Sequence, residues 1–176
     1  MATPPVFSVG QFNTAAYMNS IGMWLVKSQT VGTGVSSVTV TGAFSADYDN
    51  YRIIYAGGVT SANDLAFQIR FANTAGHYAN MRYDAWTGAA GTLATVNQNQ
   101  AYFGLSGQAT QTTMVLDVFN PYLSIFTNYS GFYTGNLYYG TGGGVYAQNS
   151  SITSFTIIAP SFTMTGGTIK IYGYRN

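Results

Sequence analysis

The sequence predicts an all-β protein: an antiparallel β-sandwich of jelly-roll-like arrangement, preceded by a short N-terminal segment of different character. Charged residues make up only 6% of the chain, and all five acidic residues are aspartates. Ordinary soluble domains contain about 25% charged residues. The abundant residue types here, among them Thr, Val, Ile, Tyr, Gly and Asn, favour strands and turns over helices. Apolar and polar residues also alternate with a period of two, between clusters of turn-forming residues.

The N-terminal segment, residues 1–25, contains no charged residue and no regular strand pattern. Tyr17, Ile21 and Trp24 follow one another at helical spacing, which predicts one short helix. Two interpretations stay open: the segment covers the core of its own domain, or it is an arm that attaches to another subunit. Covering the domain's own core is the commoner arrangement, but an uncharged leader of this length gives the arm equal weight, because a solvated leader is normally polar. The candidate attachment residues are Phe7, Phe12, Tyr17, Met23 and Trp24.

The remaining chain, residues 26–176, is predicted to form the β-sandwich domain. The clearest strand is LAFQIRF, residues 65–71, in which every second residue is apolar and points to the same face. The final run, GTIKIYGY, predicts a closing strand with Ile169 and Ile171 on its buried face. About nine or ten short strands with turn signals between them are typical of a sandwich. The other predicted strands lie in SSVTVTG, YRIIYAGG, YANMRYDAW, NQAYFGLSG, TTMVLDVFNP, SIFTNYSGFY, GNLYYGTG and ITSFTIIAP.

Two segments are predicted as turns or loops. SADYDNY, residues 45–51, gathers side chains that hydrogen-bond their own backbone in turns. GTGGGVY, residues 140–146, is glycine-rich and is predicted to form a loop tip. It differs from a phosphate-binding loop because neither Lys-Ser/Thr nor a helix follows it.

Residues suited to catalysis or metal binding are scarce. The chain has no cysteine, and its single histidine, His77, lies in a predicted turn without a nucleophile and acid around it. Asp47 and Asp49 stand two residues apart, but a hydrogen-bonded turn explains them better than a carboxylate pair or a calcium site. We therefore expect no enzymatic activity, no cofactor and no metal.

Asp117 interrupts an apolar run, MVLDVFN. It is predicted either to face solvent on the same side as Val115 and Phe119 or to be a buried charge paired with an arginine. Arg52, Arg70 and Arg82 are the candidate partners. A buried pair would fix strand register or a subunit contact rather than perform chemistry.

The charge pattern also bears on partners. The six basic residues are scattered singly, so the basic stripe that nucleic acid requires is missing. No run of about 18 apolar residues predicts a membrane span, and no signal peptide is apparent. A formal net charge of +1 leaves little repulsion between copies, so we expect a homo-oligomer or a part of a larger assembly.

Tyrosine is the commonest aromatic residue, with 15 copies, and the segment FYTGNLYYGTGGGVY concentrates it. Tyrosine with Ser, Gly and Asn is a mixture that binding surfaces use. The alternative is that these rings alternate into the core or into a subunit contact, and packing is the favoured interpretation. The candidate glycan or subunit contacts are Tyr138, Tyr139 and Tyr146.

Four stretches together resemble a group of tailed-bacteriophage virion modules: FNTAAYMNSIGMWLVKSQTV, GAFSADYDNYRIIYAGG, ITSFTIIAPS and the ending GGTIKIYGYRN. Members of that group have an N-terminal attachment segment followed by a β-sandwich that ends in such a strand. They occur as capsid decoration (cement) proteins and as distal domains of tail fibres or tailspikes, commonly as trimers. The resemblance spans nearly the whole chain and implies no catalytic residue.

The resemblance implies a virion structural protein whose partners are other copies of itself in a homotrimer and the major capsid protein. A 176-residue chain that starts at Met1 without a fibrous shaft favours the decoration protein, assembled in the host cytoplasm and displayed on the outer capsid surface. The alternative is a receptor-binding tip of a tail fibre or tailspike that recognises a host cell-surface glycan. Neither nucleic acid nor a membrane is an expected partner.

Overall fold

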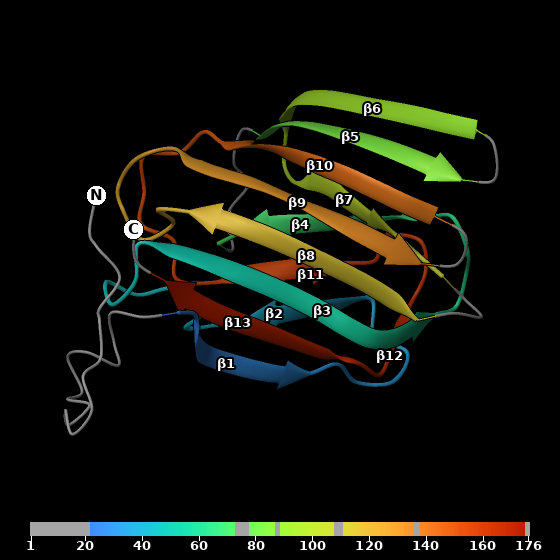
Figure 1. Ribbon diagram of the computed structural model, residues 1–176, viewed down its shortest axis with the longest axis horizontal. Helices are drawn as coiled ribbons and strands as arrows, with labels where there is room; N and C mark the ends of the chain where they lie inside the picture. The colour runs from blue at the N-terminus through green and yellow to red at the C-terminus, as the bar shows by residue number, and fades with distance from the viewer. Residues whose placement is uncertain (1–21, 73–77, 87–88, 108–110, 136–137, 175–176) are drawn as a thin grey trace, which may run out of the picture.

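Two antiparallel sheets pack face to face, so the all-β sandwich is confirmed (Figure 1). The computed structural model describes residues 22–72, 78–86, 89–107, 111–135 and 138–174, and within them it contains strands but no helix. The nine-stranded sheet has the order β1-β13-β3-β8-β9-β10-β5-β6, with β12 paired to β3. Its strands are β1 (Trp24–Thr30), β3 (Asn50–Thr60), β5 (Tyr78–Trp86), β6 (Ala89–Gln98), β8 (Thr112–Phe119), β9 (Thr127–Gly135), β10 (Tyr138–Tyr146), β12 (Met164–Thr165) and β13 (Thr168–Tyr174).

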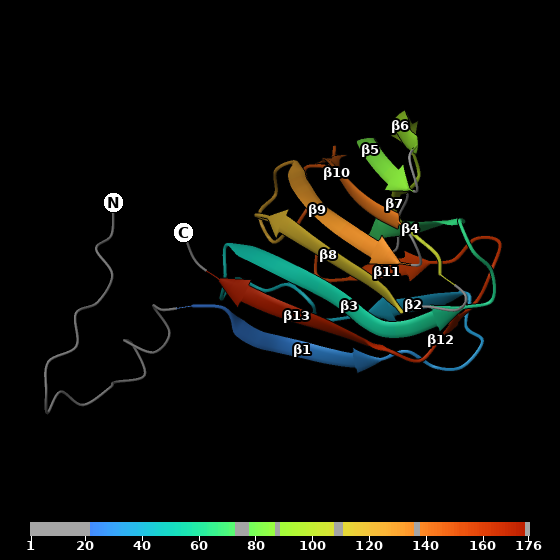
Figure 2. The same ribbon diagram turned by 45° about the vertical axis from the view of Figure 1, so that its right-hand side comes forward.

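The smaller sheet lies behind the large one in both Figure 1 and Figure 2. It has four strands in the order β2-β11-β4-β7. The large sheet therefore has an inner face that packs on the small sheet and an outer face turned toward the viewer of Figure 1. The strands of the small sheet are β2 (Ser37–Val40), β4 (Ala66–Phe71), β7 (Ala101–Leu105) and β11 (Phe155–Ile158).

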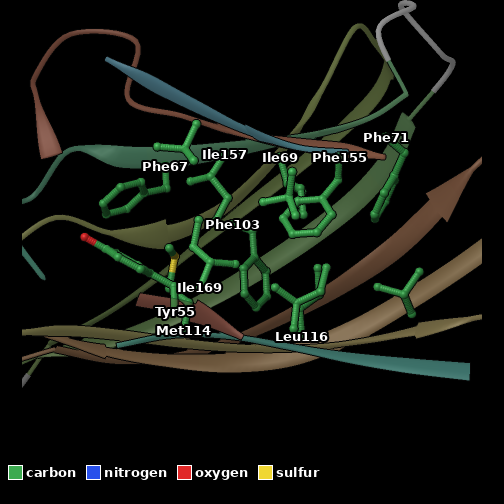
Figure 3. Packing of buried hydrophobic residues seen from close by; sticks show 14 of the residues in the cluster. Tyr55, Phe67, Ile69, Phe71, Phe103, Met114, Leu116, Phe155, Ile157 and Ile169 are labelled. Atoms are coloured by element: carbon green, nitrogen blue, oxygen red, sulfur yellow. The ribbon is translucent and has the colours of Figure 1, made fainter. Parts of the chain in front are cut away.

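Side chains from both sheets fill the space between them (Figure 3). Phe67, Ile69 and Phe71 alternate along β4 into this core, as the period of two in residues 65–71 predicts. Phe67 meets Phe162 edge to face, with ring centroids 4.9 Å apart. Such aromatic pairs add about 0.5–1.5 kcal/mol to the gain from apolar burial.

The C-terminal strand is confirmed and lies inside the large sheet rather than at its edge. β13 pairs with β3 along its whole length and, on its other side, with β1 from Thr168 to Gly173. Ile169 and Ile171 are fully buried, whereas Lys170 is exposed on the outer face. The last strand is therefore held by two neighbouring strands.

Two sequence-based expectations need correction. Residues 140–146 are not a loop tip: they lie in β10, paired on both sides with β9 and β5. A Cβ on Gly140 would come within 2.2 Å of the Tyr133 ring, so glycine is required here by close packing rather than by a turn. Trp24, expected in a short helix, is the first residue of β1. The rest of that predicted helix lies outside the described residues.

The turn predicted in residues 45–51 is confirmed up to Asp49, with Asn50 and Tyr51 already in β3. The buried Tyr51 holds it through its hydroxyl, which donates a hydrogen bond to the Ser45 carbonyl (2.9 Å) and accepts one from the Ser45 backbone N–H (2.8 Å). An Asx-rich turn is thereby fixed to the core.

Tyr55 makes folding stability sensitive to alkaline pH. Burial of its ring raises the pKa of the hydroxyl from 10.0 to about 12. Because the folded-state pKa is raised, this contribution to stability is fully present below pH 10.0 and is lost as the pH rises toward 12. In Tyr55→Phe, which lacks the ionisable group, we expect the free energy of unfolding to fall less over this interval, by up to about 2.7 kcal/mol. Urea titrations of both proteins from pH 8 to 12 measure the difference, and parallel curves would contradict it.

Candidate attachment surface

The loop between β8 and β9, residues 120–126, has a backbone that is tied down at several points. The Asn120 backbone N–H donates to the Asp49 carbonyl (2.9 Å), and the Ile152 N–H donates to the Pro121 carbonyl (2.8 Å). A turn bond joins the Leu123 N–H to the Asn120 carbonyl (3.1 Å). Asn120 adopts a positive φ of 53°, a conformation that asparagine tolerates better than most residues. Backbone hydrogen bonds to neighbouring segments therefore position the loop, and a side-chain hydrogen bond between the Ser124 and Ser151 hydroxyls (3.3 Å) adds to them.

This anchored loop presents its apolar side chains to solvent. Tyr122, Leu123, Ile125 and Phe126 are between 36% and 52% exposed, while Pro121 is buried beneath them. Single exposed apolar residues are ordinary on protein surfaces, but a contiguous group of them marks a contact site. A loop that holds such a group in place gives up little conformational freedom when a partner covers it.

The same end of the sandwich is where the N-terminal segment joins the domain (Figure 1). Trp24 pairs with Gly173, Gly173 with Tyr51, and Tyr51 with Val118, so the start of β1 and the end of β8 lie in one row. Three strand spacings separate them, which is roughly 14 Å. Met23 and Leu25 are two further exposed apolar side chains at the start of β1, and on the outer face the Arg52–Asp117 pair lies between Leu25 and the loop. We call this group the apolar end surface: Met23, Leu25, Tyr122, Leu123, Ile125 and Phe126.

The predicted attachment residues divide between described and undescribed parts of the chain. Met23 is exposed and belongs to the apolar end surface, whereas Trp24 is half-buried where β1 meets β13. Phe7, Phe12 and Tyr17 lie outside the described residues. The sequence interpretation missed residues 122–126, although four apolar residues that directly follow the Asn-Pro turn signal could have indicated an exposed loop.

The three candidate tyrosines do not form one binding platform. Tyr146 is 1% exposed and packs against Phe71 with ring centroids 5.9 Å apart, so it is a core residue and not a surface contact. Tyr138 is half-buried on the inner face, where its hydrogen bond to the Asp64 carboxylate, together with burial, raises the pKa of its hydroxyl. Tyr139 is exposed on the outer face. Consecutive strand residues point to opposite faces, so Tyr138 and Tyr139 cannot stack on the same ligand ring.

The Asp117 carboxylate binds Arg52 in a two-point ion pair across β8 and β3. Arg52 Nε donates to Asp117 Oδ1 (2.8 Å) and Arg52 Nη2 to Oδ2 (2.7 Å). The hydrogen bond to Asp117 raises the pKa of Arg52. Asp117 lies on the outer face with Val115 and Phe119, one of the two expected placements, and it also has the arginine partner that was expected only of a buried charge; the two residues stand directly opposite each other in the β3–β8 register.

Groups suited to metal chemistry do not gather in the described part of the chain, where no three His, Asp or Glu side chains lie close enough to hold an ion. Asp47 lies in the turn before β3, accepts a hydrogen bond from the Ser45 hydroxyl (2.9 Å) and is exposed. His77 lies outside the described residues. No helix suited to crossing a membrane occurs in the portion that the structure describes.

Comparisons of the chain with protein-family models, with curated proteins and with solved structures find no match. The apolar end surface and the sequence resemblance therefore carry the functional inference.

Proposed function

We propose that this chain is a structural protein of a tailed-bacteriophage virion: a homotrimeric decoration (cement) protein on the outer head surface that bridges and stabilises major capsid protein subunits. The observation that supports this best is the apolar end surface, which includes Met23 and Leu25 of the uncharged N-terminal segment. A β-sandwich that has an anchored apolar loop and few acid–base groups is better suited to binding a partner than to catalysing a reaction. The protein is assembled in the host cytoplasm and then displayed on the virion.

The mechanism rests on repetition. In the proposed mode each copy contributes one apolar contact of moderate strength to the shell. Joining copies in a trimer converts later contacts into intramolecular ones, which raises the overall affinity without any new kind of interaction. A shell bridged in this way would resist the outward pressure of packaged DNA.

The triple variant Leu123→Ser, Ile125→Ser, Phe126→Ser tests the contact. We expect about 100-fold weaker binding to purified heads that lack the protein, because three half-exposed side chains would each lose about 1 kcal/mol of burial at the contact. The thermal midpoint should change little, since these side chains lie outside the core. Occupancy by quantitative gel densitometry is the measurement. Asn149→Ser, at an exposed polar position near the same loop, is the control. Unchanged occupancy in the triple variant would contradict the assignment.

The second candidate function is a receptor-binding tip that recognises a host cell-surface glycan, and the exposed Tyr139 ring on the outer face is the observation in its favour. This function predicts glycan-array binding that Tyr139→Ala abolishes. The buried Tyr146→Ala would act only by weakening the fold.

A further inference from the structure

Strand β5 places its apolar side chains outside and its charged side chains inside. Met81 and Tyr83 are 62% and 46% exposed on the outer face. Arg82 and Asp84 point to the inner face, where their side chains are 12% and 7% exposed and form an ion pair of 2.9 Å. A strand with one solvated face normally shows the reverse arrangement. A shift of register by one residue would bury Met81 and Tyr83 and expose the charges, so the observed register leaves an apolar outer face in contact with water.

The neighbouring strands continue this outer face. In one row across the sheet, Phe132 of β9 pairs with Thr141 of β10, and Thr141 pairs with Tyr83 of β5. Phe132 is exposed, as are Tyr139 and Val96. Among the described outward positions of β9, β10, β5 and β6, none is Lys, Arg, Asp or Glu. We call this half of the outer face, seen toward the top of Figure 1, the outer aromatic face: Met81, Tyr83, Val96, Phe132, Thr141 and Tyr139.

Charges on the outer face occur only on the other side of it, in the described residues. Lys170 of β13 and the Arg52–Asp117 pair of β3 and β8 lie there. The boundary between the two halves runs along β8. If the whole outer face were a solvated surface, charged residues would be expected on all of its strands.

A shallow depression of about 300 Å³ lies within the outer aromatic face, between Ser130 and Met81. Gly143 pairs with both of these residues and brings no side chain to the space between them. Alanine is excluded at that position, because its Cβ would come within 2.7 Å of the Tyr129 carbonyl oxygen. The face thus carries both projecting aromatic rings and a hollow bounded by Thr141 and Tyr83.

We propose that the outer aromatic face is the contact between copies of this chain. A second copy brings the same projecting rings and the same hollow, so two of these faces can meet across a two-fold axis, with the rings of one copy opposite the hollow of the other. It meets no charge repulsion, since both faces are uncharged. Four strands of about nine residues cover roughly 550 Å² per copy, so two copies bury about 1,100 Å², near the lower limit of specific interfaces. This proposal goes beyond the proposed function, because a face that contacts itself joins two copies across a two-fold axis, whereas the homotrimer requires a separate contact between different patches.

Two variants that place opposite charges at residue 132 test this contact. The experiment uses the purified full chain without capsids. We expect the wild type to be a homo-oligomer by light scattering, and Phe132→Lys and Phe132→Asp each to elute as the 18.8 kDa protomer. Mixing the two variants should restore part of the oligomer, because each supplies the counter-charge of the other. Ser28→Lys, at an exposed position of β1, is the control that should keep the wild-type mass. Thermal melts establish that all variants are folded.

A monomeric wild type overturns the proposal, and so does an oligomer that persists in both Phe132 variants. If the wild type is monomeric and binds glycans through Tyr139, the face is a ligand-binding surface, and the proposed contact between copies is overturned as well. A dimer that the Phe132 variants dissociate supports it, whereas a trimer that they dissociate shows a head-to-tail contact in place of the self-complementary one and overturns it. A negative result for this contact is distinguishable from a negative result for capsid attachment, because attachment is measured as head occupancy of the triple loop variant.

Discussion

Removal of residues 167–176 is expected to abolish folding. The deletion takes away β13, which lies between β1 and β3 and is paired with both. Ile169 and Ile171 leave the core with it, and each fully buried isoleucine contributes about 1.5–3 kcal/mol. β1 then loses the strand on which it pairs, and β3 gains an unpaired edge. Together the two isoleucines account for about 3–6 kcal/mol, which reaches the lower end of the 5–15 kcal/mol by which ordinary domains are stable, and the lost backbone pairing adds to this.

Circular dichroism during heating and size-exclusion chromatography measure this outcome. We expect no cooperative transition and loss of soluble protein. A control that lacks only residues 175 and 176, which follow β13, should melt like the full chain. A soluble deletion variant with a cooperative melt would show that β13 is dispensable.

Gly131→Ala is expected to be the most damaging small substitution. Gly131 pairs with Leu116 of β8 and Gly142 of β10, where the backbones approach closely. A Cβ added there would lie 1.9 Å from the Val115 carbonyl oxygen and 2.9 Å from Leu116 Cα. These atoms belong to the backbone of a central strand, so no side-chain rotation relieves the clash. We expect a loss of about 3 kcal/mol or more, at the upper end of overpacking effects.

Urea titration of Gly131→Ala against the wild type gives the change in the free energy of unfolding. Gly32→Ala is the matched control, because its nearest contact is 3.2 Å from a Val35 methyl group that can shift. The control should lose less than about 1 kcal/mol. Equal losses in the two variants would mean that backbone crowding at Gly131 is not the cause.

The strands could be predicted because alternation is a local property. The buried positions of β4 and β13 follow from every second residue being apolar. Sheet order could not be predicted, since β13 meets β1 and β3 through pairings between distant parts of the chain. The role of the glycines in residues 140–146 could not be predicted for the same reason. They make room for the Tyr133 ring and the neighbouring backbones, and nothing in the local sequence distinguishes that role from a turn.

The candidate surfaces were harder to predict than the fold. Residues 124–126 continue an apolar run and were expected to begin a strand, whereas β9 begins only at Thr127. Their exposure depends on hydrogen bonds from Asn120 and Ile152, which lie outside that run. The exposure of Met81 and Tyr83 in β5 could not be predicted either, because alternation defines two faces and does not say which of them is buried.

Locating the chain in a cryo-EM map of the intact virion tests the proposed function most directly. The account predicts density for the β-sandwich on the outer head surface, with residues 122–126 turned toward the shell and neighbouring copies in contact with one another. Density confined to the tail tip would contradict the decoration role and support the receptor-binding alternative.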